Sequence, residues 1–228
     1  MSSPKVQVSP RWAAAETVDG FRTSPPNEVL LEYARTLLER HPGARALDIG
    51  CGAARNALPL ARLGFSVVGT DLSEPMLVAA RERHRQEAPA TNVTFLHAAM
   101  APLPAADASA DLVVAHGIWN LARTDAELRT AISEAARVAR DGAGLFLFTF
   151  SRATLPPGAT PVAGQHFVFT QFSGEPMVFL TEAEVFQLLG DAGFVRDPQG
   201  PLTEYNRPSS VGPTAGPVLL EGTFTRIR

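Results

Sequence analysis

The sequence predicts an α/β fold built around a mostly parallel, doubly wound sheet. Short apolar strands alternate with amphipathic segments of about 10–15 residues, the pattern that βαβ units produce. The chain has 228 residues, 45% hydrophobic and 19% charged. This composition supplies one large core and excludes disorder of the weakly hydrophobic, highly charged kind.

Local signals place the elements of the first half of the chain. The segment 1–26 is polar and is expected to be irregular. An apolar stripe with helical spacing follows and ends before a helix-stop cluster at 41–43. Strands are expected at 44–49, 66–70, 93–98 and 111–115, and helices at 54–63, after Ser73 and after Thr124, where capping patterns begin.

The alternation breaks in the last third, where proline and glycine are frequent. After a strand at 145–150, residues 151–180 are expected to form an insertion with one or two strands. A capped helix then begins at Thr181 and ends at Gly193, in the left-handed conformation that glycine favours there. Residues 198–217 are expected to be a loop, and 218–227 a last strand that is split near Gly222.

Charge, hydropathy and cysteine content exclude several classes of protein. The net charge of −3 gives no electrostatic drive toward nucleic acid. No apolar run approaches the roughly 18 residues of a membrane span, and residues 1–12 lack the apolar core of a signal peptide. The single cysteine, Cys51, excludes an internal disulfide. We therefore expect a cytoplasmic protein that binds no membrane, no nucleic acid and no metal.

The strongest chemical signal is a glycine turn with an acidic residue just before it and a second acidic residue at the end of the next predicted strand. Asp48-Ile49-Gly50-Cys51-Gly52 ends a predicted strand and leads into a helix, and glycines at such a turn let the backbone approach a ligand. Asp71 follows 19 residues after Gly52, at the end of the next predicted strand. A carboxylate at that position accepts hydrogen bonds from a ribose diol, so the pair predicts a nucleoside-containing ligand.

The details of the turn distinguish between nucleoside cofactors. A dinucleotide fingerprint requires a third glycine where this chain has Arg55. Asp48 suits a cationic group rather than a pyrophosphate, and adenosine with an amino-acid tail and a sulfonium describes S-adenosylmethionine. A nicotinamide-dependent oxidoreductase remains the alternative from the residues alone.

Four segments resemble the motifs of class I S-adenosylmethionine-dependent methyltransferases, closest to their small-molecule branch. The resemblance covers about residues 44–196 and rests on 48–52, 71–77, 103–114 and 180–194. It implies a three-layer Rossmann-like methyltransferase fold, with a mostly parallel seven-stranded sheet and an antiparallel last strand. It also implies one domain over 27–228 and a lid formed by 1–26.

The resemblance implies cofactor contacts at matching positions, with two departures from the family pattern. Ala54 replaces a common third glycine, and 97–100 lack the acid that often binds adenine. The expected cofactor-binding residues are Asp48, Gly50, Cys51, Gly52, Asn56, Asp71, Leu72, Met76, Ala99, Met100 and His116.

The expected reaction is methyl transfer by in-line displacement onto a small-molecule acceptor, in a monomer or homodimer. His116 follows the fourth predicted strand and is the candidate general base; a structural or cofactor-contacting role is the alternative. The expected residues around the methyl acceptor are Trp12, Phe21, Trp119, Phe172 and Tyr205. A non-catalytic protein that binds S-adenosylmethionine is a further alternative.

Overall fold

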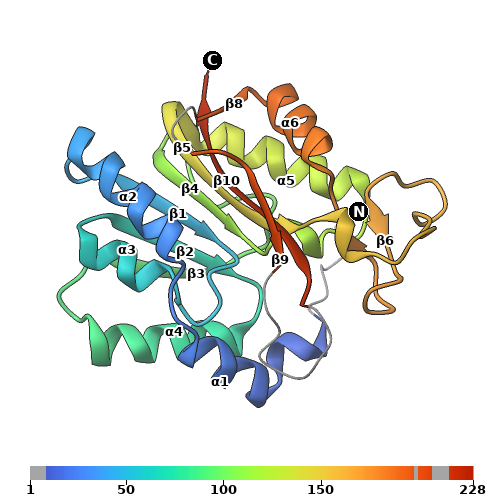
Figure 1. Ribbon diagram of the computed structural model, residues 1–228. Helices are drawn as coiled ribbons and strands as arrows, with labels where there is room; N and C mark the ends of the chain where they lie inside the picture. The colour runs from blue at the N-terminus through green and yellow to red at the C-terminus, as the bar shows by residue number, and fades with distance from the viewer. Residues whose placement is uncertain (1–8, 198–199, 207–215, 228) are drawn as a thin grey trace, which may run out of the picture. The chain divides into compact units, whose positions relative to one another are not determined.

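The computed structural model describes residues 9–197, 200–206 and 216–227. The chain forms two compact units, Met1–Pro104 and Ala105–Arg228. Each consists of strands with helices packed against them (Figure 1). None of the helices in the described ranges has the length and apolar character needed to cross a membrane.

The first unit contains three parallel strands in the order β3-β2-β1. They are β1 (Arg45–Ile49), β2 (Ser66–Asp71) and β3 (Val93–His97), and the helices are α2 (Glu28–Arg40), α3 (Ala57–Leu63) and α4 (Glu74–Glu87). Side-chain caps fix two helix starts, because Asn27 accepts the Leu30 N–H and Ser73 accepts the Met76 N–H. All three strands lie where the sequence predicts them.

The described part of the N-terminal segment is mostly helical, so the prediction of an irregular segment is wrong there, and residues 1–8 of the predicted segment 1–26 lie outside the described residues. The described part forms a 3₁₀ turn, η1 (Pro10–Ala13), and a helix, α1 (Ala15–Thr23). Trp12, Val18 and Phe21 pack against a cluster that includes Ala53 and Met76. These few apolar residues are too sparse for a periodicity signal, and tertiary packing stabilises the helix instead.

The second unit contains β4 (Ala110–His116), β5 (Ala139–Phe150), β8 (Phe194–Arg196), β9 (Thr203–Asn206) and β10 (Val218–Arg226). β4 and β5 are parallel, whereas β10 is antiparallel to β5, β8 and β9. The predictions of a mostly parallel α/β fold and of an antiparallel last strand are therefore confirmed.

Two predictions about the C-terminal third are wrong. β9 lies in the segment 198–217, predicted to be a loop, and brings the sheet to eight strands among the described residues instead of seven. Residues 198–199 and 207–215 of that segment lie outside the described residues. β9 forms because β8 pairs only with Phe224–Arg226, which leaves Val218–Glu221 free to pair with β9. β10 is not split at Gly222. A Cβ there would lie 2.9 Å from Leu202 Cα, so this glycine allows close packing.

Helices α5 (Asp125–Val138) and α6 (Glu182–Asp191) complete the second unit. Thr181 and Glu184 form the predicted capping box of α6. Phe186 of α6 packs against Phe224 of β10 at a ring distance of 6.1 Å. The insertion 151–180 contains η3 (Arg152–Thr154) and a two-stranded ribbon of β6 (Val168–Phe169) and β7 (Met177–Val178), beside the end of β5 (Figure 1).

Candidate functional site

The turn after β1 takes left-handed backbone conformations at three positions. The φ angles of Gly50, Gly52 and Ala54 are 69°, 53° and 63°. Ala54 therefore adopts the conformation that a glycine would take without strain, at a cost of about 1–3 kcal/mol. Because the turn continues to Asn56, α3 begins at Ala57 and not at 54 as the sequence predicts.

Asp71 connects this turn to the start of α4. Its Oδ2 accepts the Gly52 N–H at 2.9 Å, and its Oδ1 accepts the Ser73 N–H at 2.8 Å. Burial raises the pKa of Asp71, and these backbone hydrogen bonds oppose that rise. An ionised carboxylate has about four acceptor positions, so Asp71 retains capacity for ribose hydroxyls.

Asp48 is a buried carboxylate that is incompletely hydrogen-bonded. Its residue is 2% exposed, and Oδ2 has no hydrogen-bond partner among the described residues. Burial raises the pKa of Asp48 to about 7, although the positive charge of Arg55 lowers it. A buried carboxylate oxygen without a hydrogen-bond partner is costly, and a cationic ligand group would satisfy it.

Cys51 lies within the turn, but its side chain is directed into the core. A Cβ on Gly69 would lie 2.9 Å from Cys51 Sγ, so the thiol packs under β2. Burial also raises the pKa of Cys51 well above its usual value. Only the backbone of Cys51 is suited to contact a cofactor.

The other predicted cofactor residues of the first unit lie on or after its helices and strands. Asn56 Oδ1 accepts the Asn27 N–H at 3.0 Å and thereby joins the turn to α2. Met76 is buried on α4, while Leu72, Ala99 and Met100 are half-buried. His97, which sequence reasoning missed, pairs in register with Asp71, and its Nε2 donates to Leu72 O at 2.9 Å. Its position at the end of the third strand was the available signal.

Trp12 and Phe21 lie against the glycine turn. A Cβ on Gly52 would lie 3.1 Å from Phe21 Cδ1, and the two aromatic rings contact edge to face at 5.8 Å. Ser73 Oγ also donates to Trp12 O at 2.8 Å. Within the first unit these two predicted acceptor-binding residues therefore cover the glycine turn.

Two rows of side chains meet on one face of the second unit. His116, Phe148 and Glu221 are in register across β4, β5 and β10. Phe150 is in register with Leu219, which pairs with Tyr205 of β9. Registered neighbours project to the same face, and residues 148 and 150 share a face, so His116 and Tyr205 belong to one surface.

The rings at this surface are closely packed. His116 stacks on Phe148 with a centroid distance of 4.1 Å and an interplanar angle of 8°. Phe172, which is 44% exposed, contacts Phe150 at 5.5 Å and Phe179 at 5.7 Å. Trp119 is 2% exposed on η2 (Trp119–Leu121), and its Nε1 has no partner in the described ranges.

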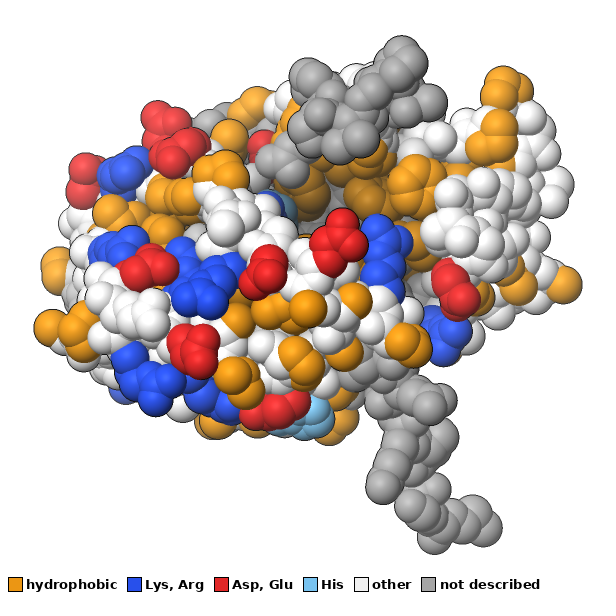
Figure 2. All heavy atoms as spheres, turned by 90° about the horizontal axis from the view of Figure 1, so that it is seen from below, with side chains coloured by type: hydrophobic (Ala, Val, Ile, Leu, Met, Phe, Trp, Pro, Cys, Tyr) orange, Lys and Arg blue, Asp and Glu red, His pale blue; other side chains and the backbone are white. Residues whose placement is uncertain are grey.

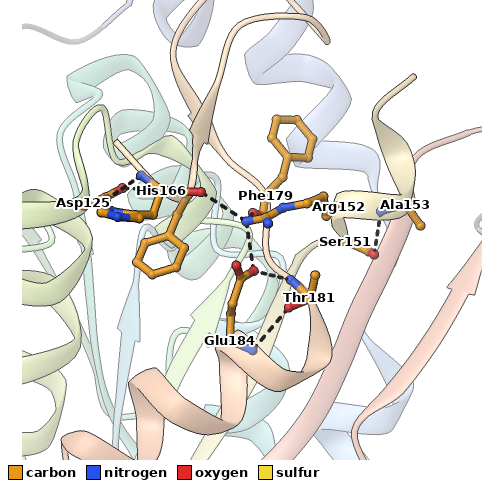
Figure 3. A network of polar contacts seen from close by, with 9 residues as sticks. Asp125, Ser151, Arg152, Ala153, His166, Phe179, Thr181 and Glu184 are labelled. Carbon is orange, nitrogen blue, oxygen red and sulfur yellow. Dashed lines mark hydrogen bonds and ion pairs between the residues drawn. The ribbon is translucent and has the colours of Figure 1, made fainter. Parts of the chain in front are cut away.

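Polar contacts fix the insertion to both helices of the second unit (Figure 3). Arg152 Nη2 pairs with Glu184 Oε2 at 2.9 Å and donates to the carbonyl oxygens of His166 and Phe179. Asp125 accepts the backbone N–H of His166 at 2.7 Å and that of Phe167 at 3.1 Å. These contacts hold the ribbon at the end of β5.

The glycine turn, the Asp71 carboxylate at the end of β2 and the buried Asp48, whose Oδ2 has no hydrogen-bond partner among the described residues, suit a nucleoside cofactor with a cationic tail. Residues 46–142 match the model of a family described as a methyltransferase domain. Together with the relatives described below, this match supports a class I S-adenosylmethionine-dependent methyltransferase with S-adenosylmethionine as its cofactor. The nicotinamide-dependent alternative is not favoured.

Several similar proteins are also described as methyltransferases. The chain is 28% identical over 216 residues to the O-methyltransferase resE of Aspergillus sclerotiorum. The aligned region covers 89% of this chain and 80% of that protein. It is 33% identical over 135 residues to the O-methyltransferase rstn1 of Aspergillus nomiae, 55% and 59% of the two chains. A SAM-dependent methyltransferase from Methanosarcina mazei has the same fold, with a TM-score of 0.66 and 20% identity over 90% of this chain and 99% of that one.

Proposed function

We propose that this methyltransferase transfers the methyl group of S-adenosylmethionine to a small-molecule acceptor. The observation that carries the proposal is the buried Asp48 beside the glycine turn, whose Oδ2 has no hydrogen-bond partner among the described residues and suits the ammonium of the cofactor's amino-acid tail. Asp71 would hold the ribose, and Leu72, Met76, Ala99 and Met100 would surround the adenine. The cofactor supplies a methyl group already activated for displacement.

The protein's own part is to orient the methyl acceptor, exclude water and remove a proton. We assign proton removal to His116, which stands at the end of β4, where ligands of parallel α/β sheets bind. We also propose that residues 10–23 act as a lid over the cofactor, because Phe21 lies against Gly52 of the glycine turn.

The distribution of charge favours a small-molecule acceptor over nucleic acid, and the cysteine content favours a cytoplasmic location. On the face drawn in Figure 2, acidic and basic side chains are interspersed and do not form a basic track. The single cysteine is typical of a reducing compartment. We propose that the enzyme works there as a monomer or homodimer.

The reaction is tested by incubating the full chain with S-adenosylmethionine and a panel of phenols, amines and thiols. We expect S-adenosylhomocysteine to form with at least one compound and binding of S-adenosylhomocysteine to raise the melting temperature. The control is NADH, which should not raise it. Stabilisation by NADH alone would contradict the assignment, and binding without turnover on any compound would favour the non-catalytic alternative.

His116→Phe should separate catalysis from structure. The phenyl ring preserves stacking on Phe148 but cannot accept a proton. We expect kcat to fall by about 10²–10⁴ while the Kd for S-adenosylhomocysteine stays within about twofold. Equal losses of turnover and cofactor affinity would instead make His116 a cofactor-binding residue. The measurements are steady-state kinetics and calorimetry.

A further inference from the structure

Asn120 is a buried asparagine whose side-chain oxygen lacks a partner in the part of the chain that the structure describes. The residue is 3% exposed, and its Oδ1 has no hydrogen bond. The Oδ1 atoms of Asn27 and Asn56, also buried, each accept a backbone N–H. Leaving a buried acceptor unpaired costs about 1–3 kcal/mol, which points to a partner outside the chain.

The position of Gly117 shows where this oxygen lies. A Cβ on Gly117 would be 3.9 Å from Asn120 Oδ1 and 4.0 Å from Phe148 Cδ1. The oxygen and the ring edge therefore approach the same side of Gly117, at the end of β4. Because Phe148 stacks on His116, the unpaired oxygen lies close to the candidate base.

Phe148, the ring nearest to this oxygen at Gly117, belongs to an aromatic row on one face of β5. Phe150 follows Phe148 on the same face, and its ring meets those of Phe172 and Phe179 at 5.5 and 5.6 Å. Phe172 remains 44% exposed, so it offers ring surface to a ligand. Rings in offset or edge-to-face arrangements favour another flat aromatic group over a saturated one.

We propose that the methyl acceptor is a planar aromatic compound with a hydroxyl or amino substituent, and that this substituent donates a hydrogen bond to Asn120 Oδ1. Asn120 thereby determines specificity. The proposal rests on the methyltransferase function above and adds the class of acceptor. It gives a role in one arrangement to an oxygen without a partner among the described residues and to an exposed phenylalanine that contacts Phe150 of the same aromatic row.

The test uses calorimetry on the full chain saturated with S-adenosylhomocysteine. The probes are 2-naphthol, 2-methoxynaphthalene, which lacks the donor hydrogen, and decahydro-2-naphthol, which lacks the aromatic rings. We expect 2-naphthol to bind about tenfold more tightly than either analogue. 2-Methoxynaphthalene loses the hydrogen bond and decahydro-2-naphthol loses the ring contacts, and each loss is expected to cost about a factor of ten in affinity.

Variants separate recognition from stability. Asn120→Ala should abolish the preference for 2-naphthol over 2-methoxynaphthalene, because it removes the acceptor oxygen, whereas Asn27→Ala should keep that preference. Asn27→Ala should lower the melting temperature, because Asn27 caps α2. Phe172→Leu should weaken both naphthalenes about fivefold, whereas Phe186→Leu, in the ring pair with Phe224, should not.

Three outcomes would overturn the proposal: equal affinity for the three probes, no binding of 2-naphthol at about 1 mM, or a preference that survives in Asn120→Ala. Binding of S-adenosylhomocysteine without binding of 2-naphthol would refute this proposal alone. Failure to bind S-adenosylhomocysteine would refute the proposed function as well.

Discussion

Replacing Asp48 with asparagine is expected to stabilise the cofactor-free protein at pH 8 and to weaken cofactor binding. A carboxyl whose pKa rises on folding favours the folded state at low pH, and this contribution is lost as the pH rises from the unfolded pKa to the folded one. For Asp48 the window runs from 3.8 to about 7. Across this pH window the free energy of unfolding of the wild type should fall by about 4 kcal/mol, and that of the Asn variant should not.

The expected gain in melting temperature is roughly 5–15 °C at pH 8, and it should vanish near pH 4. Cofactor binding has the opposite dependence, because only ionised Asp48 pairs with an ammonium. The affinity of the wild type for S-adenosylhomocysteine should rise about tenfold per pH unit below about pH 7, and that of Asp48→Asn should stay low and flat.

Thermal denaturation and calorimetry between about pH 4 and 8 measure both effects. The control is Asp107→Asn, because Asp107 is an exposed carboxylate paired with Arg137 and should show neither effect. A melting temperature of Asp48→Asn at or below that of the wild type at pH 8 would contradict the burial penalty. Unchanged affinity would contradict the role assigned to Asp48 in binding the cofactor tail.

Asp71→Ala is expected to weaken binding of S-adenosylhomocysteine by about tenfold or more. The substitution removes the proposed ribose contact and leaves the Gly52 and Ser73 N–H groups without their carboxylate partner. Calorimetry should therefore show a large loss even where the variant remains folded.

The 2′,3′-dideoxy analogue of S-adenosylhomocysteine separates ribose recognition from support of the turn. The wild type should prefer the natural compound, and Asp71→Ala should bind both compounds equally weakly. If Asp71 only supported the turn, the variant would lose affinity for both and keep the preference. Asp71→Asn retains one acceptor oxygen and should give an intermediate preference.

Much of the cofactor half was predictable because its signals are local. A strand, a glycine turn and a helix cap depend on neighbouring residues, so Asp48, Gly52 and Asp71 could be located from spacing alone. The strand ends they occupy meet because parallel strands share an edge. Motif spacing gives no burial, however, so neither the raised pKa of Asp48 nor the lack of a described hydrogen-bond partner for its Oδ2 was predictable.

The C-terminal half was less predictable because its arrangement depends on contacts between distant segments. β9 forms only because β8 leaves half of β10 unpaired, and β10 stays continuous at Gly222 because Leu202 packs there. The helix at 15–23 likewise depends on packing of its few apolar residues against α4.

The sequence by itself determined the α/β class, the glycine turn, the two aspartates and the family resemblance, since these follow from residue order and local conformation. Only the tertiary structure brought His116, Phe148 and Tyr205 onto one face and left Asn120 Oδ1 buried without a partner among the residues that the structure describes. Strand register and burial set those relationships, and both arise from long-range packing that no local pattern specifies.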